Sequence, residues 1–139
     1  MTRGELLDFL RRRRLAVVST ASSNGKPESA VVGIAVSEDL EIVFDTVRTS
    51  RKYRNLAVNP SVAVATWTGE KTAQYEGIAS ELGEADARYR DLYLEIFPDG
   101  RDRLSWPGIT HFVIRPAWIR YSDFAARPPV IEEFTFEGN

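Results

Sequence analysis

Four basic and three Ser or Thr side chains lie together in the segment FDTVRTSRKYRNLAVNP, residues 44–60, although the whole chain carries a formal net charge of −2. The basic residues are Arg48, Arg51, Lys52 and Arg54, and the Ser and Thr residues are Thr46, Thr49 and Ser50. Cations in the first turn of a helix are electrostatically unfavourable, because a helix N-terminus already carries partial positive charge. Free backbone N–H groups, a hydroxyl and flanking cations do bind phosphate. The segment therefore predicts a phosphate site at a helix start, against the alternative of a solvated, positively charged helix end.

The composition narrows the classes of protein to which the chain can belong. Its 139 residues suit one domain with one core, and 43% hydrophobic with 27% charged residues is typical of globular proteins. The negative charge and a pI near 5.5 disfavour general binding to nucleic acid or acidic membranes. The lack of cysteine excludes disulfides and thiolate chemistry and fits a reducing cytoplasm. No apolar run approaches the ~20 residues that span a bilayer, and the N-terminal segment lacks the apolar core of a signal peptide.

Hydrophobic periodicity predicts a mainly β (α+β) fold in a single domain of residues 1–139. Thr2, with Glu5 three residues later, is typical of a capped N-terminal helix. Asn24-Gly25 predicts a hairpin turn, Gly77 a bulge, and Pro116 a break in the last strand. Six strands joined mostly by tight turns indicate a small antiparallel barrel with peripheral helices. The strands are expected at 15–21, 28–36, 40–46, 61–68, 72–82 and 109–124, the helices at 1–14, 51–58 and 83–98, and a C-terminal tail at 125–139.

The other residues that could do chemistry favour structural roles. Trp67 and Trp106 could stack on a planar ligand or pack in a core or subunit interface, and Trp118 is expected in the core. The single histidine, His111, lies in an apolar strand, where a structural or interface role is expected, and it cannot form a metal site alone. The basic run 11–14 ends the first helix, so a solvated face or an intersubunit salt bridge is expected. The sequence indicates no metal site, and it leaves the catalytic residues unknown.

The segment FDTVRTSRKYRNLAVNPSVAV resembles the FMN-binding segment of the pyridoxamine 5′-phosphate oxidase-like flavoprotein family. In that family a strand ends in Thr, Ser-Arg-Lys opens a helix four residues later, and Asn-Pro closes the helix before the next strand. The resemblance in the order of elements covers Leu15 to about Leu82, and more loosely extends to Asp123. It implies a split β-barrel fold and an FMN molecule, bound without a covalent bond, whose phosphate is held by Thr46, Ser50, Arg51 and Lys52.

The same resemblance also implies which residues lie near the flavin ring and how the protein assembles. A Gln of the family lies near the ring, and Gln74 matches it; Trp106 is expected near the ring as well. The family forms homodimers with cofactor sites at the subunit interface, so a homodimer acting on a small-molecule substrate is expected. The oxidases proper carry an Arg and a Lys where this chain has Ala30 and Ala35, and their C-terminal arginine motif has no clear counterpart. The implied activity is an FMN-dependent oxidoreductase of unspecified substrate.

Three alternatives stay open. A deazaflavin could replace FMN in the same fold, as in relatives of the family. The chain could instead be a flavin carrier or stress-related sensor without turnover. A β-barrel without flavin could bind nucleic acid, although the acidic balance disfavours this. Hydride chemistry belongs to the flavin itself, so the lack of an evident acid, base or nucleophile agrees with the flavin alternatives.

Overall fold

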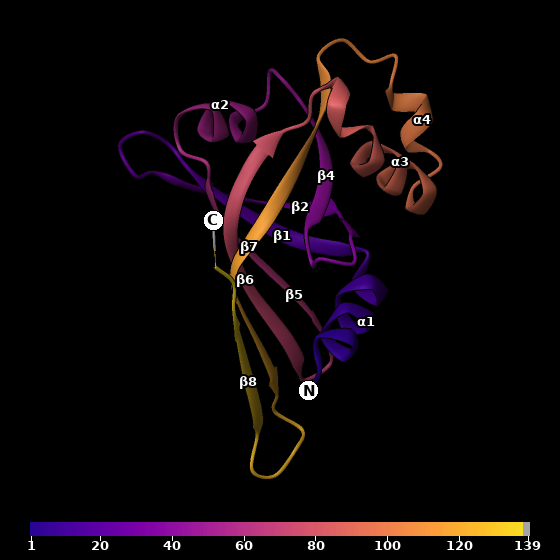
Figure 1. Cartoon of the computed structure of the whole chain (residues 1–139). Helices are drawn as coiled ribbons and strands as arrows, with labels where there is room; N and C mark the ends of the chain where they lie inside the picture. The colour runs from indigo at the N-terminus through magenta and orange to yellow at the C-terminus, as the bar shows by residue number, and fades with distance from the viewer. Residues whose placement is uncertain (138–139) are drawn as a thin grey trace.

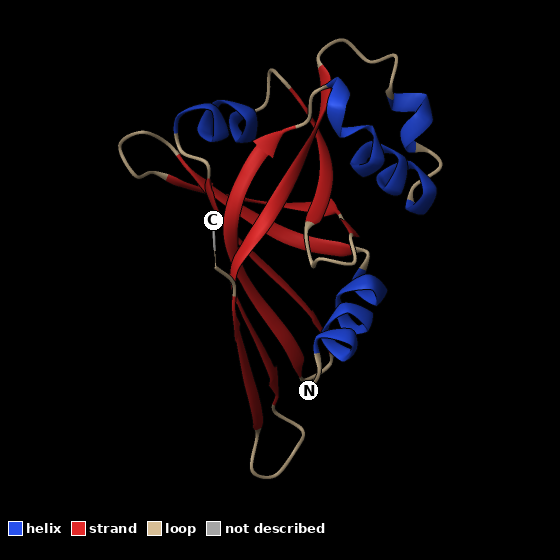
Figure 2. Ribbon diagram, viewed as in Figure 1, coloured by secondary structure: helices blue, strands red, loops and turns tan. Residues whose placement is uncertain are grey.

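The computed structural model describes residues 1–137 and consists of a strongly curled antiparallel sheet with helices around it (Figure 1). In Figure 2 the strands form the centre of the molecule and the helices lie at its periphery. The sheet has the strand order β2-β1-β5-β6-β7-β4-β3, and β8 pairs with β7. The strands are β1 (Leu15–Ala21), β2 (Pro27–Gly33), β3 (Ala35–Val36), β4 (Ile42–Val47), β5 (Ser61–Thr68), β6 (Lys71–Glu81), β7 (Ile109–Asp123) and β8 (Val130–Thr135). The helices are α1 (Arg3–Arg13), α2 (Arg51–Val58), the 3₁₀ turn Glu84–Asp86, α3 (Ala87–Ile96) and α4 (Gly100–Arg103).

The alternation of side chains along the strands separates a barrel interior from an outward face. In β5, Val62 and Val64 are buried, whereas Ala63, Ala65 and Trp67 are exposed. This is the two-residue period of a strand with unlike faces. The predicted mainly β, antiparallel split-barrel fold is therefore confirmed, although the sheet of the described chain has eight strands instead of six, because it also includes the short β3 and the C-terminal β8.

Two hydrophobic clusters hold the fold together. The larger fills the barrel, where the rings of Phe44 and Phe112 stack with their centroids 5.6 Å apart. Tyr75 is buried in this cluster, and its hydroxyl donates to the carbonyls of Leu40 at 2.7 Å and Ile114 at 3.1 Å. A buried hydroxyl must find such partners, because leaving it unpaired costs about 1–3 kcal/mol. The smaller cluster packs α3 against β3, β4 and β7.

Gly77 permits a close approach between β6 and β7. A Cβ at this position would lie 2.2 Å from the carbonyl oxygen of Arg115. The pairing shifts register between Glu76 and Gly77, which confirms the predicted bulge. Strand β7 nevertheless continues through Pro116, so the expected break takes the form of this irregularity.

Several predicted boundaries were wrong because they depend on distant pairing. The strand expected at 28–36 divides into β2 and β3, because the N–H of Ile34 donates to the carbonyl of Arg14 and the chain then pairs with β4. The helix expected at 83–98 is a 3₁₀ turn followed by α3, and α4 was not predicted. The expected tail at 125–139 contains β8, which pairs with β7 in the hairpin that extends away from the helices in Figure 1. Residues 138–139 of that tail lie outside the described residues.

Helix α1 begins as the sequence predicts, with the Thr2 and Glu5 side chains forming a reciprocal capping box. Its basic end is largely exposed, as expected of a solvated face, and two of its arginines also bind backbone carbonyls of other elements. Arg11 donates to the carbonyl of Val36 at 2.9 Å, and Arg14 donates to that of Ile96 at 2.9 Å. These residues therefore tie α1 and the start of β1 to neighbouring elements. Among the described residues, no helix has both the length and the hydropathy needed to cross a membrane.

Candidate functional site

The end of β4 and the start of α2 bring Thr46 and Ser50 together, as the sequence predicts. Their hydroxyls share a hydrogen bond of 3.0 Å. Ser50 is the N-cap of α2, and its hydroxyl oxygen accepts a hydrogen bond from the N–H of Tyr53 at 3.0 Å. The N–H of Arg54 donates to the Ser50 carbonyl. First-turn N–H groups have no partner within their own helix, so the amides of Arg51 and Lys52 are the two that stay available.

Lys52 is the candidate residue with the most unusual surroundings. Its side chain is only 9% exposed, yet its ammonium makes no hydrogen bond or ion pair with any residue in 1–137. The stem of the side chain is covered, but the Nζ is not one of the fully enclosed polar atoms that lack a partner. Lys52 lines a hollow of about 410 Å³, together with Val31 and Gly33 of β2, Asp45 of β4 and Arg103 of α4. The ammonium therefore supplies an unmatched positive charge beside a cavity.

The other three cations of the segment already have partners. The Arg51 Nε lies 3.5 Å from an Oε of Glu28 on β2, and the Arg51 side chain is 51% exposed. Arg48 donates to Glu81 at 3.1 Å, and Arg54 donates to the carbonyl of Thr49 at 2.8 Å. The four basic residues therefore differ in burial and in pairing, which the sequence does not show. Lys52 alone among them is both buried and unpaired within the described chain.

A network of charged side chains forms one wall of the Lys52 hollow. Arg103 donates to Asp45 at 2.8 Å, to Asp99 at 2.8 Å and to the Tyr93 hydroxyl at 3.2 Å. Burial, with a contribution from Asp45, raises the pKa of Tyr93 to about 12, so the phenol stays protonated at neutral pH. The network fixes α3 and α4 against β4. Sequence reasoning missed these residues, because Arg103 and Asp45 are 58 positions apart and neither belongs to a local motif.

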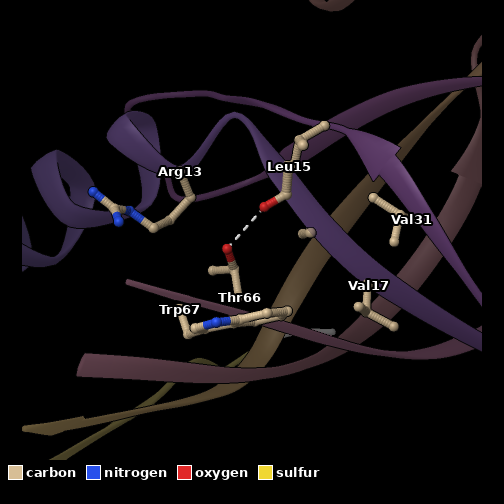
Figure 3. Close-up of a pocket in the computed structure, with 7 residues that line it drawn as sticks. Arg13, Leu15, Val17, Val31, Thr66 and Trp67 are labelled. Carbon is tan, nitrogen blue, oxygen red and sulfur yellow. Dashed lines mark hydrogen bonds between the residues drawn. The ribbon is translucent and has the colours of Figure 1, made fainter. Parts of the chain in front are cut away.

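A second hollow, of about 430 Å³, opens on the outward face of the sheet (Figure 3). Its lining is mainly apolar, and in Figure 3 the ring of Trp67 lies along one side of it, across from Leu15. Thr66 donates to the carbonyl of Leu15 at 2.8 Å, which joins β5 to the start of β1. Leu15 and Val31 line both hollows, so the apolar hollow adjoins the one beside Lys52.

The structure places none of the three tryptophans in the core of the single chain, so the core expectation for Trp118 was wrong, while Trp67 and Trp106 keep the ligand and interface alternatives. Trp67 is 59% exposed and Trp106 is 53% exposed, so neither is a core residue of the single chain. Trp118 is half-buried, because it lies opposite Glu76 on the outward face, which the sequence pattern alone could not assign. Trp106 lies in the loop between α4 and β7.

The structure does not join Gln74 or Trp106 to the Thr46–Ser50 pair through any contact within residues 1–137. Gln74 is exposed on β6, where it pairs with Ala65 on one side and Arg120 on the other. Ala65 in turn pairs with Val17, which lines the apolar hollow. Gln74 therefore shares the outward face with that hollow, two strands away from β1.

His111 lies between the sheet and α3, and it lines neither hollow, although its neighbours Tyr93 and Asp45 line the one beside Lys52. It is 4% exposed, its Nε2 has no hydrogen-bond partner in the described chain, and its ring makes an edge contact with Tyr93 at 5.4 Å. Burial lowers the pKa of His111, against an opposing effect of Asp45. Its role is therefore that of a neutral packing residue. Within residues 1–137 there is also no group of three or more His, Asp or Glu side chains placed to hold a metal ion.

The sequence of the chain is similar to that of a known protein family. Residues 2–123 match the family described as pyridoxamine 5′-phosphate oxidase. The chain is 29% identical over 92 residues to a pyridoxine/pyridoxamine 5′-phosphate oxidase of Rubrobacter xylanophilus. That alignment covers 65% of this chain and 41% of the relative, so the chain spans less than half the length of the enzyme that it matches.

Solved structures share the fold at low sequence identity. A heme binding protein from Mycobacterium smegmatis superimposes with a TM-score of 0.82 at 16% identity, covering 97% of this chain and 58% of that protein. General Stress Protein 26 from Bacillus anthracis superimposes with a TM-score of 0.74 at 23% identity, covering 98% of this chain and all of that protein. At such identities the similarity shows the architecture alone, since one fold hosts many functions.

Proposed function

Because this chain belongs to the pyridoxamine 5′-phosphate oxidase family, we propose that it binds FMN without a covalent bond and acts as an oxidoreductase on a small-molecule substrate. The observation that carries the proposal is Lys52, an unpaired cation with 9% exposure beside a cavity. A phosphate at this position would match the charge of Lys52. It would also accept from the free amides of Arg51 and Lys52 and from a hydroxyl of the Thr46–Ser50 pair.

The two adjoining hollows fit a ligand that has an anionic end and a planar apolar end. The phosphate would lie near Lys52, and the ring would lie in the hollow beside Trp67, past the Leu15 and Val31 side chains that the hollows share. Trp67 offers a largely exposed ring for stacking. FMN, when bound, supplies the hydride chemistry itself. The chain's own residues bind the phosphate, orient the ring and keep water from one of its faces.

Vitamin B6 oxidation is not part of the proposal. The oxidases proper carry an Arg and a Lys where this chain has Ala30 and Ala35, and Ala35 is buried here, with 2% exposure. A substrate different from that of the oxidases is therefore expected.

The proposal favours a flavin over a heme, although solved proteins of this fold include a heme binding protein. A protein commonly holds heme iron through a histidine. His111 is the single histidine of the chain, and it is covered by Tyr93 on the α3 side of the sheet. Neither of the two adjoining hollows is lined by this residue.

We propose further that the protein is a homodimer that meets its second copy through the outward face of β1, β2, β5 and β6. Large apolar side chains are exposed there, with 58% exposure for Leu15, 65% for Val31 and 59% for Trp67. The exposed small side chains of Ala65 and Ala63 follow Trp67 along the same face of β5, opposite Val17 and Ser19 of β1, and they permit a second sheet to approach closely. A contiguous apolar patch of this kind is typical of a protein interface. A dimer formed here would place Gln74 of one chain near the ring hollow of an assembled site.

Absorbance and mass spectrometry of the ligand that co-purifies with the protein test the cofactor. Release of FMN supports the proposal. Release of a deazaflavin would show that the cofactor is a deazaflavin instead of FMN, and a Soret band, which indicates heme, would refute the flavin assignment. Enzymatic turnover is tested by mixing the FMN-loaded protein anaerobically with reduced nicotinamide nucleotides. Reduction faster than that of free FMN supports an oxidoreductase, whereas reduction at the rate of free FMN favours a flavin carrier.

A further inference from the structure

The carboxylate of Glu81, at the last residue of β6, receives hydrogen bonds from three side chains on three other segments. Its Oε2 accepts from the Arg48 Nε at 3.1 Å and from the Thr110 hydroxyl at 2.6 Å. Its Oε1 accepts from the Tyr53 hydroxyl at 3.0 Å. Hydrogen bonds to an ionised carboxylate are stronger than those between neutral groups. Glu81 therefore links the end of β6 to the β4–α2 turn, to α2 and to β7 through hydrogen bonds.

All three donors border the turn between β4 and α2. Arg48 lies within the turn, two residues after Thr46 and two before Ser50. Tyr53 lies in the first turn of α2, directly after Lys52, and its ring packs edge-on against Phe112. Thr110 lies on β7 at the position that pairs with Thr46. The Glu81 carboxylate is thus bonded to the middle of the turn, to the helix that follows it and to the strand beside it.

We propose that Glu81 is a positioning residue, which holds the β4–α2 turn in the conformation that presents Thr46, Ser50 and Lys52 to the ligand phosphate. This inference rests on the proposed function. Glu81 does not line either hollow, so it acts through the residues that it binds. Ordering a free turn costs conformational entropy for each residue that becomes fixed. A turn that is already fixed avoids this cost when the phosphate binds.

The ionisation state of the Glu81 carboxylate suits this positioning role. Burial raises the pKa of Glu81, but the hydrogen bonds from Thr110, Tyr53 and Arg48 outweigh that effect and lower it. The group is therefore ionised at neutral pH and accepts from all three donors.

Electrostatics alone makes the opposite prediction. A carboxylate near a bound phosphate repels it, so removal of the charge by itself would strengthen FMN binding. If positioning dominates, removal of Glu81 weakens FMN binding instead. The sign of the change in affinity therefore separates the two effects.

The test is fluorescence titration of FMN and riboflavin with Glu81→Ala and with Tyr53→Phe, which removes one donor and keeps the ring. We expect the Kd for FMN to rise about 5- to 10-fold in Glu81→Ala, which removes all three bonds, and about 2- to 4-fold in Tyr53→Phe, which removes one, because only the cost of ordering the turn is passed on to the ligand. The Kd for riboflavin should change less than 2-fold. Glu70→Ala, at an exposed turn position, is the matched control and should leave both unchanged.

Hydrogen exchange of the ligand-free protein supplies a second readout. Peptides that cover residues 47–54 should exchange faster in Glu81→Ala and in Tyr53→Phe than in the unmodified chain or in Glu70→Ala. Unchanged or tighter FMN binding in both variants would overturn the positioning role while leaving the phosphate site intact. If the unmodified protein binds FMN no better than riboflavin, the proposed function fails, and the positioning role fails with it.

Discussion

Replacement of Lys52 by methionine isolates the charge at the proposed phosphate site. Methionine has a similar length and an unbranched, adaptable side chain, so Lys52→Met keeps most of the packing at a position with 9% exposure. The substitution removes the one cation of the β4–α2 segment that is both buried and unpaired within the described chain. The expected result is loss of FMN affinity without loss of the fold.

The magnitude follows from the interaction that is removed. A hydrogen bond to a charged group contributes about 1.5–3 kcal/mol, and every 1.4 kcal/mol changes an equilibrium constant about tenfold. The Kd for FMN should therefore rise about 10- to 100-fold. Riboflavin lacks the phosphate, so its Kd should be nearly unchanged. Arg51→Gln should have a smaller effect, because the Arg51 side chain is half-exposed and Glu28 already offsets its charge.

The ligand-free protein should change little. The Lys52 residue is 9% exposed, but its Nζ is not one of the fully enclosed polar atoms that lack a partner, so Lys52→Met should leave the free energy of unfolding nearly unchanged when no ligand is present. Stabilisation of the protein by added FMN should become smaller in the same variant, because stabilisation by a ligand depends on its concentration relative to its Kd.

The assay is fluorescence titration with FMN and riboflavin, combined with thermal unfolding in the presence and absence of FMN. Lys71→Met is the matched control, since Lys71 is exposed at the start of β6, and it should change neither affinity. Equal losses for FMN and riboflavin would show that Lys52 supports the fold rather than the phosphate. An unchanged Kd for FMN would refute the site altogether.

Three further predictions address the ring, the interface and the fold. Trp67→Ala should raise the Kd values of FMN and riboflavin by the same factor, about 3- to 10-fold, because it removes stacking on the ring; a loss confined to FMN in the titration would contradict this. Ala65→Arg should convert a dimer near twice 15.7 kDa into a monomer in sedimentation, because Ala65 lies on the outward face; a persistent dimer would rule out that face. Gly77→Ala should lower the free energy of unfolding by on the order of 3 kcal/mol, because the new Cβ would lie 2.2 Å from the Arg115 carbonyl oxygen; an unchanged urea midpoint would show that β6 and β7 can separate locally.

The parts of the fold that depend on neighbouring residues could be read directly from the sequence. The capping box of Thr2 and Glu5 and the cap of Ser50 on α2 join residues only three positions apart. The strands around Val18 and Val64 follow from the two-residue alternation of buried and less buried side chains. Around Phe44 the expected alternation is absent, because the barrel covers one face of β4 and α3 covers the other. The β4–α2 segment is also contiguous, so its resemblance to a known family is visible in the order of its residues.

Pairing between distant segments could not be read in this way. The segment after Ala125 has a Pro-rich start and an acidic end, and it becomes part of the sheet because β7 has an unpaired edge at Trp118–Asp123. The exposure of Trp67 likewise depends on which face of β5 turns toward the barrel. An apolar residue in a strand can lie on either face, and the neighbouring strands decide between them.

The sequence by itself determined where cations and hydroxyls gather, because that property belongs to one continuous segment. Tertiary structure decided which cation is free to bind a ligand. Arg48 is neutralised by Glu81, 33 positions later, and Arg51 lies beside Glu28 on a separate strand. Lys52 has no such partner within residues 1–137. The charge of each side chain is fixed by its chemistry, but its availability depends on the carboxylates that folding brings beside it.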